Sequence, residues 1–315
     1  MAEIITMGEI IVEIMRTTVD EPLNMTGTFR GPFPSGAPAI FIDTAARLGH
    51  TAKIIGGVGD DDFGRCVLAR LSGDGVDVSD VIVNDRISTG CAFVTYFADG
   101  SRKFIFHIGN TPAVLAPAPA REKLADAKYF HVMGCSMMAD LAFGRRIVDS
   151  MIAANDQGAK VSFDPNIRPE LMKDPEAMDL VHAVMDRMNI YLPGVGELLQ
   201  FAGCEKVEDA VAKYFENPNL EIIVLKDGSR GCHVYTREGK VFDFGVYKAK
   251  PVDATGAGDS FDAAFLCGLI EGMSVEDATK LATAAATLNI AAFGPMEGKI
   301  SRENCDAIIK ENNIQ

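Results

Sequence analysis

Apolar segments with the composition of β-strands alternate with helix-like segments along most of this 315-residue chain. The strand-like segments are short and apolar, and they cover residues 4–15, 51–59, 128–133, 160–164, 188–192 and 220–228. Helix-like segments lie between them, at residues 37–48, 62–75, 141–156, 177–188 and 194–203. Strands that alternate with helices predict right-handed βαβ units, and therefore a mostly parallel sheet with helices on both faces. We expect an α/β fold.

Two segments in the first third of the chain break this alternation. Residues 91–108 form two β-rich arms around Asp99-Gly100, a dipeptide that strongly favours a hairpin. Residues 16–34 are rich in turns and contain Pro22, Pro32 and Pro34. We expect a single domain over residues 1–315 with a small β-sheet built from about 10–34 and 88–112. Such an appendage makes few core contacts, so it could move as a lid; the alternative is an ordinary surface hairpin.

Charge and cysteine content limit the classes of partner. The net charge of −14 disfavours binding to nucleic acid or to an anionic membrane. The seven cysteines include no C-x-x-C pair, so their spacing suggests neither a zinc site nor a disulfide framework. Scattered thiols are typical of a cytoplasmic protein. The first residues lack the basic region of a signal peptide, and no apolar run approaches the length of a membrane span.

Residues 253–261, DATGAGDSF, carry the most informative motif. Apolar residues recur with helical spacing after Asp259, so Gly256, Ala257 and Gly258 lie at or near a helix N-terminus. The first amides of a helix have no partner within it, and the helix dipole places positive potential at the same point. Because glycine lets a ligand approach the backbone closely, this turn predicts an anion cradle that suits phosphate.

Two aspartates flank this turn, and their roles are open from the motif alone. Asp259 could simply cap the helix. It could also act as the general base of phosphoryl transfer, because it lies beside amides that would hold the charge of the transferred group. Asp253 would hold the loop or bind a cation.

The motif DATGAGDSF resembles the C-terminal signature of the ribokinase-like (PfkB) carbohydrate kinases, D-T-x-G-A-G-D-x-F. The resemblance extends over nearly the whole chain. It includes the opening strand IITMGEIIVEIM, the stretches SGAPAIFIDTAARLG and GGVGDDDFGRCVLARLSGDGVDVS, and the segment SFDPNIRPEL, which is similar to the D-x-N-x-R segment of fructokinases and ketodeoxygluconate kinases. It implies a three-layer ribokinase-like α/β body with a β lid, and ATP as phosphoryl donor with Mg²⁺.

The resemblance also implies roles for individual residues. Asp259 takes the role of catalytic base, and the backbone of Gly256, Ala257 and Gly258 that of the anion hole. The segment KDGSRG places Lys226 and Gly228 near ATP, and AATLNIAAFG places Asn289 and Gly294 near adenine and the cation loop. Glu197 matches the glutamate of the family's N-x-x-E motif, which organises Mg²⁺ and its waters. Asp253 and Thr255 match positions that bind a monovalent cation in many members, which leaves activation by K⁺ open.

The acceptor side of the motifs departs from the family pattern. Glu13 stands where an aspartate grips sugar hydroxyls, and Ser35-Gly36-Ala37 replaces the start of the Gly-Gly motif. Ile40 replaces a sugar-binding asparagine, and its side chain cannot hydrogen-bond to a hydroxyl. His107 stands where ketodeoxygluconate kinases have an arginine for the substrate carboxylate, whereas Arg168 is retained. Gly194 replaces the asparagine of N-x-x-E.

Several of these residues also have simpler interpretations. Glu13 could be a solvated acid at a strand end, and Arg168 could form a salt bridge that fixes its turn. His107 could lie on the lid surface, and Lys226 could be a solvated strand end.

The leading hypothesis is an ATP-dependent kinase that phosphorylates a hydroxyl of a small sugar, with Glu13, Gly36, Ala37, His107, Arg168 and Asp259 binding the acceptor. The alternatives are a nucleoside kinase of the same fold, with Ile40, Phe104 or Phe106 against the base, and a catalytically silent nucleotide- or sugar-binding protein. An exposed lid edge predicts a homodimer formed through the lid.

Overall fold

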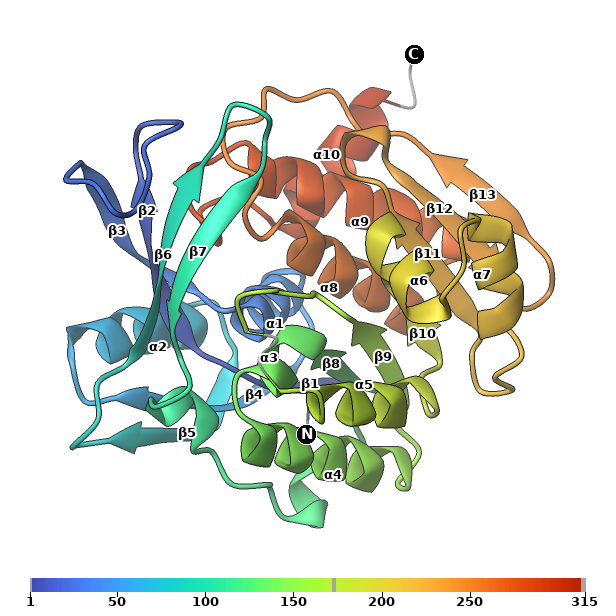
Figure 1. Cartoon of the computed structure of the whole chain (residues 1–315). Coiled ribbons are helices and arrows are strands. Elements are labelled where there is room, and N and C mark those ends of the chain that lie inside the picture. The colour runs from blue at the N-terminus through green and yellow to red at the C-terminus, as the bar shows by residue number, and fades with distance from the viewer. Residues whose placement is uncertain (1, 172–173, 313–315) are drawn as a thin grey trace.

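The large sheet forms the centre of the molecule in a computed structural model that describes residues 2–171 and 174–312 (Figure 1). In this part of the chain the sheet has nine strands, in the order β13-β12-β11-β10-β9-β8-β1-β4-β5. Every pairing from β11 to β5 is parallel. Strand β12 pairs antiparallel with β11 and with β13. The strands are β1 (Ile4–Met7), β4 (Ala52–Gly59), β5 (Asp77–Asn84), β8 (Tyr129–Met133), β9 (Lys160–Asp164), β10 (Ile190–Tyr191), β11 (Ile222–Lys226), β12 (Cys232–Thr236) and β13 (Val241–Phe244).

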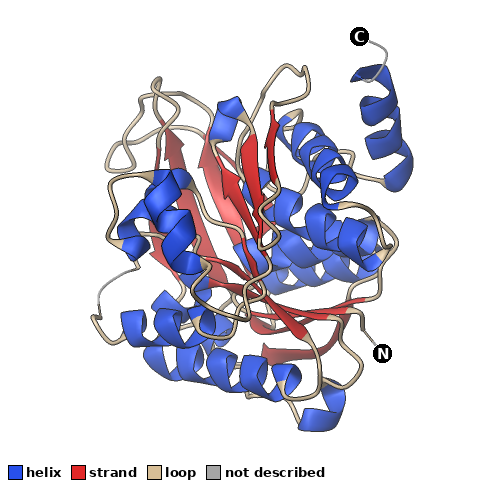
Figure 2. Ribbon diagram, turned by 90° about the vertical axis from the view of Figure 1, so that its right-hand side faces the viewer, coloured by secondary structure: helices blue, strands red, loops and turns tan. Residues whose placement is uncertain are grey.

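Helices cover both faces of this sheet (Figure 2). One face packs against α1 (Ala37–Arg47), α2 (Asp62–Gly73), α8 (Ala257–Ile270), α9 (Val275–Ile290) and α10 (Arg302–Asn312). The other packs against α3 (Gly134–Met138), α4 (Leu141–Asn155), α5 (Ala177–Met185), α6 (Val195–Ala202) and α7 (Val207–Tyr214). Short 3₁₀ turns lie at η1 (Pro112–Val114), η2 (Arg121–Lys123) and η3 (Gly228–Arg230). The expected three-layer α/β fold is confirmed, because β4 and β8 are buried along their whole length.

A second sheet of four strands, which we call the lid, has the order β3-β2-β6-β7. Its strands are β2 (Ile11–Arg16), β3 (Phe29–Ser35), β6 (Gly90–Tyr96) and β7 (Arg102–His107). Strand β2 pairs parallel with β6, while β2 with β3 and β6 with β7 are antiparallel. Asp99-Gly100 lies between β6 and β7, and Gly100 has the positive φ of 83° that this turn requires.

The expectation of one strand over residues 4–15 is wrong. The structure breaks this segment after Met7 and places β1 in the large sheet and β2 in the lid. The break begins at Gly8, which is closely packed: a methyl group on its Cα would lie 2.5 Å from Cγ of Pro38 and 2.6 Å from Oγ of Ser136. The turn-rich segment 16–34 also contains most of strand β3, which sequence reasoning missed.

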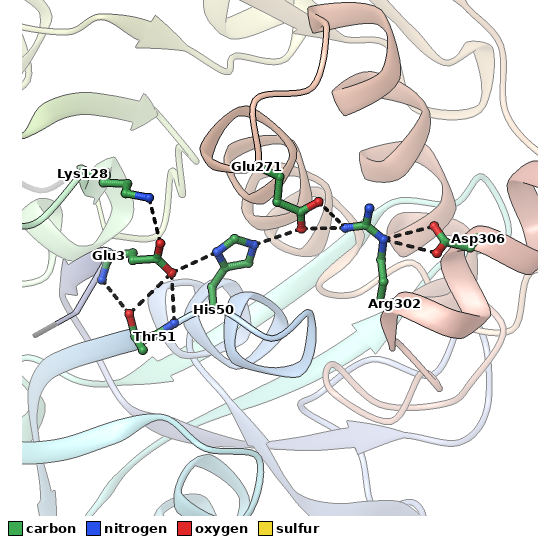
Figure 3. A network of polar contacts seen from close by, with 7 residues as sticks. All are labelled: Glu3, His50, Thr51, Lys128, Glu271, Arg302 and Asp306. Carbon is green, nitrogen blue, oxygen red and sulfur yellow. Dashed lines mark hydrogen bonds and ion pairs between the residues drawn. The ribbon is translucent and has the colours of Figure 1, made fainter.

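A network of polar contacts joins Glu3, which precedes β1, to residues of α10 (Figure 3). The ring of His50 lies between two carboxylates, with Nδ1 3.2 Å from Glu3 and Nε2 3.2 Å from Glu271. Arg302 binds Glu271 at 2.6 Å and Asp306 at 3.1 Å. The C-terminal helix is therefore tied to the sheet by charge as well as by the buried Cys305.

Within residues 2–171 and 174–312, no helix combines the length and apolar character needed to cross a bilayer.

Candidate active site

A pocket opens where the parallel strands end, between the large sheet and the lid. Glu9 follows β1, Cys135 follows β8, Asp164 ends β9 and Lys226 ends β11, and all four line it. The chain runs from β1 to β4 and β5 in one direction and from β8 to β11 in the other, so the strand order reverses between β1 and β8. Ligands of open α/β sheets bind at the carboxyl ends of strands beside such a reversal.

The N-terminus of α8 faces this pocket. Gly256 precedes the helix with a φ of 80°, and Gly256 and Gly258 line the pocket. A methyl group on Gly256 would lie 2.6 Å from the carbonyl oxygen of Pro295, so both its conformation and its packing require glycine. The first amides of α8 therefore form a main-chain site for an anion.

Asp259 lies in the first turn of α8 and lines the same pocket, with 6% of the residue exposed. Its Oδ1 accepts a hydrogen bond of 3.0 Å from Nδ2 of Asn166. Among the described residues, no amide of its own helix donates to its carboxylate, so the capping interpretation is not supported. Burial, together with the charge of Asp164, raises the pKa of Asp259 to about 7. A carboxylate with that pKa is suited to accept a proton near neutral pH.

Lys226 lies beside this helix terminus rather than in solvent, so the interpretation as a solvated strand end is wrong. Its Nζ is 2.9 Å from Asp164 and 2.8 Å from Asp262, and its side chain is 18% exposed. Asp164 and Asp262 are almost entirely buried. Burial alone would lower the pKa of Lys226, but the two carboxylates raise it, so the lysine stays charged.

Glu197 lines the pocket at the N-terminus of α6. Its two carboxylate oxygens accept hydrogen bonds from the amides of Ile167, at 2.7 Å, and Gly194, at 2.8 Å. Gly194, which replaces the family's asparagine, also lines the pocket, and a methyl group on its Cα would lie 3.3 Å from Oε2 of Glu197. Burial and the charge of Asp164 raise the pKa of Glu197.

The acceptor side of the pocket brings together Glu13, Gly36, Ala37, Ile40 and Arg168. Glu13 is buried within β2, so it is not a solvated strand end. Its Oε1 accepts a hydrogen bond of 2.7 Å from Ser35, while Oε2 has no partner among the described residues. Burial raises the pKa of Glu13 to about 7.

Arg168 makes no ion pair within the described part of the chain, so it does not fix its turn by a salt bridge. Its Nη1 donates to the carbonyl oxygen of Ile167 at 3.0 Å. Its Cζ lies 5.9 Å from the ring centroid of Phe104, on the lid.

The expected contact between His107 and the acceptor is not supported. Side chains along β7 alternate between two faces, and His107 lies on the exposed face with its ring 6.2 Å from that of Phe93. The pocket is lined instead by Arg102, Phe104 and Phe106, which lie on the other face of the same strand.

Asp253 and Thr255, the residues predicted to lie at a monovalent cation, are hydrogen-bonded to each other. Oδ1 of Asp253 accepts hydrogen bonds from the amide and hydroxyl of Thr255 and from Tyr96, and Oδ2 accepts one from the amide of Gly294. The hydroxyl of Thr255 also accepts a hydrogen bond of 3.1 Å from Nη1 of Arg102. Within the described residues Oδ2 of Asp253 accepts only the hydrogen bond from Gly294, and the role of Asp253 and Thr255 at a monovalent cation stays a prediction.

Two further residues of the predicted nucleotide site lie outside the pocket lining. Asn289 is fully buried in α9 and donates a hydrogen bond of 2.7 Å to the carbonyl oxygen of Pro295, which supports the loop under Gly256. Gly228 begins η3, beyond the end of β11. Their contacts with adenine and phosphate stay predictions.

Sequence reasoning missed Glu9, Arg102, Asn166 and Asp262. Asn166 stands in the segment SFDPNIRPEL. Asp262 follows Asp259 by three positions, which places the two aspartates on one side of α8. These spacings were a usable signal. Nothing in the sequence showed that Glu9 would be buried against Ser136 and Cys135 beside the pocket.

A helix terminus that can hold an anion, a buried carboxylate and a charged lysine meet at one edge of the sheet, an arrangement typical of α/β proteins that transfer phosphoryl groups. The model of the pfkB family carbohydrate kinases matches residues 1–301. Fructokinase-1 of Zea mays is 32% identical over 284 residues, which are 88% of this chain and 86% of that protein. The chain belongs to the pfkB family of carbohydrate kinases.

Solved structures agree with this assignment. A protein from E. coli provisionally named ribokinase II, in complex with ATP and Mg²⁺, is 35% identical and has a TM-score of 0.92 over 99% of this chain and all of that one. A fructokinase from Xylella fastidiosa with bound ATP is 21% identical with a TM-score of 0.84, and it shows the fold alone. The chain is an ATP-dependent sugar kinase that phosphorylates a hydroxyl group.

Proposed function

We propose that Asp259 deprotonates a primary hydroxyl of a small sugar or sugar derivative, which then attacks the γ-phosphorus of ATP. The observation that carries this proposal is that Asp259 and the first amides of α8 face one pocket, which lid residues Arg102, Phe104 and Phe106 line on the other side. In the transfer, the hydroxyl proton moves to Asp259 and a new bond forms between the sugar oxygen and the γ-phosphorus. The bond from that phosphorus to the β–γ bridging oxygen breaks, and ADP leaves.

The residues present fit a nucleotide whose Mg²⁺ is held mainly through phosphates and water. No cluster of three or more His, Cys, Asp or Glu side chains suited to a metal occurs among the described residues. Asp164 and Glu197 line the pocket and would hold waters of the ion. When bound, Mg²⁺ supplies charge neutralisation of the phosphates. The amides of α8 would hold the charge that develops on the transferred group.

The acceptor would be held by Glu13 and Arg168 and bounded by Ile40. Oε2 of Glu13 is available for a sugar hydroxyl, and Arg168 offers donors that no carboxylate occupies. Several relatives are named fructokinase, so fructose is the acceptor with which other sugars are compared. Because Ile40 offers no hydrogen bond on its side of the pocket, we expect a less hydroxylated sugar to be a better acceptor than fructose.

A nucleoside acceptor is the second candidate, because Phe104 and Phe106 present stacked rings to the pocket, with centroids 5.1 Å apart and planes at 10°. Such a platform suits a planar base.

A panel of sugars, sugar acids and nucleosides in an ADP-release assay tests these proposals, with ³¹P NMR to identify the phosphorylated carbon. We expect acceptor-dependent ADP release with a sugar, and a phosphomonoester on a primary carbon. Release with nucleosides alone would favour the second candidate. Release that no acceptor stimulates would contradict both. The panel is run with and without K⁺, because Asp253 and Thr255 match positions that bind a monovalent cation in many family members. A higher rate with K⁺ would support a cation site there.

We also infer that the protein is cytoplasmic and that two copies pair through the lid. Strand β7 is an edge strand of the lid, and Ile105 on its outer face is 44% exposed. If this inference is correct, Ile105→Asp gives a monomer in light scattering where the wild type gives a dimer. A monomeric wild type would contradict the pairing.

A further inference from the structure

Lys226 has one donor more than its protein partners use. An ammonium group has three N–H donors and no acceptor. Nζ donates to Asp164 Oδ2 at 2.9 Å and to the carboxylate of Asp262 at 2.8 and 3.1 Å. The two contacts with Asp262 go to neighbouring oxygens of one carboxylate and share one N–H, so the two carboxylates account for two of the three donors.

The third N–H of Lys226 is on the side of the pocket, which Lys226 lines. Lys226 is the exposed member of the cluster, with 18% of its side chain accessible against 2% for Asp164 and none for Asp262. A methyl group placed on Gly258 would lie 3.7 Å from Nζ, so the ammonium stands next to the amides of the α8 terminus. The positive charge of Lys226 and the first backbone amides of α8 therefore lie on the same side of the pocket.

The buried carboxylates hold Nζ in this position. Asp262 projects from α8, three residues after Asp259, whereas Asp164 ends β9 and is also bonded to Asn166 at 3.1 Å. Because these two aspartates lie on different elements, the ammonium group of Lys226 has little freedom to move. A preorganised donor of this kind loses little when a charge develops beside it, because it need not reorient.

We propose that Lys226 is a catalytic residue whose third N–H donates to the phosphoryl group during transfer, and that Asp262 is a positioning residue that aims it. This inference rests on the proposed function for the identity of the transferred group. Lys226 stays protonated throughout; the proton of the acceptor goes to Asp259, and the bond from the γ-phosphorus to ADP breaks. Its positive charge offsets the charge spread over the phosphoryl oxygens.

The test compares the binding of ADP with that of a non-hydrolysable ATP analogue, each with Mg²⁺, by calorimetry. We expect Lys226→Met to weaken analogue binding about 10- to 100-fold more than ADP binding, and to lower kcat about 10²- to 10³-fold. Equal losses for the two nucleotides, or no loss, would overturn the proposal. Lys53→Met is the matched control, because Lys53 also bridges two aspartates, Asp77 at 3.1 Å and Asp80 at 2.7 Å, outside the pocket. It should leave both affinities unchanged.

Lys226→Met leaves two buried carboxylates without a cation, so the variant could fail to fold. The double variant Lys226→Gln/Asp262→Asn keeps the total charge of the cluster and should show the same selective loss of the analogue. Asp262→Asn alone should lower kcat more than it raises KM for ATP. If no variant folds, a crystal structure of the wild type with the analogue decides: Nζ within about 3 Å of a γ-phosphate oxygen supports the proposal. A structure in which Nζ of Lys226 contacts only Asp164 and Asp262, and no phosphate oxygen, would refute the proposal.

The binding comparison is independent of the acceptor. If the wild type binds both nucleotides but phosphorylates no acceptor on the panel, the proposed function fails while the role of Lys226 toward the γ-phosphate is still decided.

Discussion

The side-chain amide of Asn166 donates a hydrogen bond of 3.0 Å to Oδ1 of Asp259. The same Nδ2 lies 3.1 Å from Oδ2 of Asp164, and the backbone amide of Asn166 donates to Oδ1 of Asp164 at 3.0 Å. Asn166 adopts a φ of 44°, a left-handed conformation that asparagine tolerates better than most residues. The turn after β9 therefore orients the proposed base through a fixed amide.

This contact predicts that Asn166 sets the pH dependence of the reaction. A base must be ionised, so kcat/KM should fall as the pH drops below about 7, the pKa of Asp259. The amide of Asn166 stabilises the ionised carboxylate, so Asn166→Ala should raise that pKa and move the acid limb to higher pH. The pH profile of kcat/KM measures the shift, and Asn155→Ala, at the end of α4, is the control. An unmoved limb would show that Asn166 has only a structural role.

Asp259→Asn should reduce kcat about 10²- to 10⁴-fold, because the amide cannot accept the proton of the acceptor. The affinity for ADP should stay close to that of the wild type, since the anion site is formed by the backbone of α8. Single-turnover kinetics and ADP calorimetry measure the two effects separately. Full turnover in this variant would remove Asp259 from the mechanism.

Glu13→Ala should raise KM for the acceptor about 10- to 100-fold and leave KM for ATP unchanged. Glu13 lies on the lid side of the pocket, and its removal leaves the acceptor hydroxyl without a partner. The measurement is steady-state kinetics with one substrate varied at a time, and the exposed Glu122 provides the control variant Glu122→Ala. A rise in KM for ATP instead would place Glu13 at the nucleotide.

The sequence predicted β1, β4 and the run from β8 to β11 because these strands are mostly buried and apolar. It missed β5, β12 and β13, whose residues are partly exposed. It did not predict the break after Met7, because the residues on both sides of the break are equally apolar. The close packing of Gly8 there involves Pro38 and Ser136, which come from other elements. Long-range packing of this kind leaves no local signal.

The candidate site was predictable where a sequence motif determines the local backbone conformation, as at Gly256 and Asp259 at the N-terminus of α8. It was not predictable where side chains from distant strands meet. The contact of Lys226 with Asp164 joins residues 62 positions apart. His107 shows a different limit: β7 carries apolar residues on both faces, so alternation alone could not show that Phe106 rather than His107 meets the pocket.

The network in Figure 3 predicts that His50 contributes to stability. Both ring nitrogens lie 3.2 Å from carboxylates, and the side chain is 8% exposed. His50→Ala should lower the free energy of unfolding by about 1 kcal/mol, because it leaves Glu3 and Glu271 without this bridge. Urea denaturation measures the change. Arg65→Ala, which removes an exposed ion pair to Asp60, should cause no measurable change. Equal effects of the two substitutions would contradict the prediction.

Asp43 predicts a pH-dependent loss of stability. It lies in α1 with 1% of the residue exposed, and its Oδ1 has no partner among the described residues. Burial, with the charge of Asp74 nearby, raises its pKa to about 8, whereas an unfolded aspartate titrates near 4. Between these values the folded state binds the proton and the unfolded state does not. Stability therefore falls as the pH rises from about 4 to about 8.

Asp43→Asn removes this titration and keeps the shape of the side chain. The free energy of unfolding of the wild type should fall relative to that of the variant by up to about 1.4 kcal/mol per pH unit, and the difference should level off above about pH 8. Urea denaturation of both proteins between pH 5 and 9 measures it, with Asp149→Asn on the exposed side of α4 as control. A difference that stays constant over this range would mean that Asp43 is ionised in the folded protein, with Arg47, 3.6 Å away, compensating its charge.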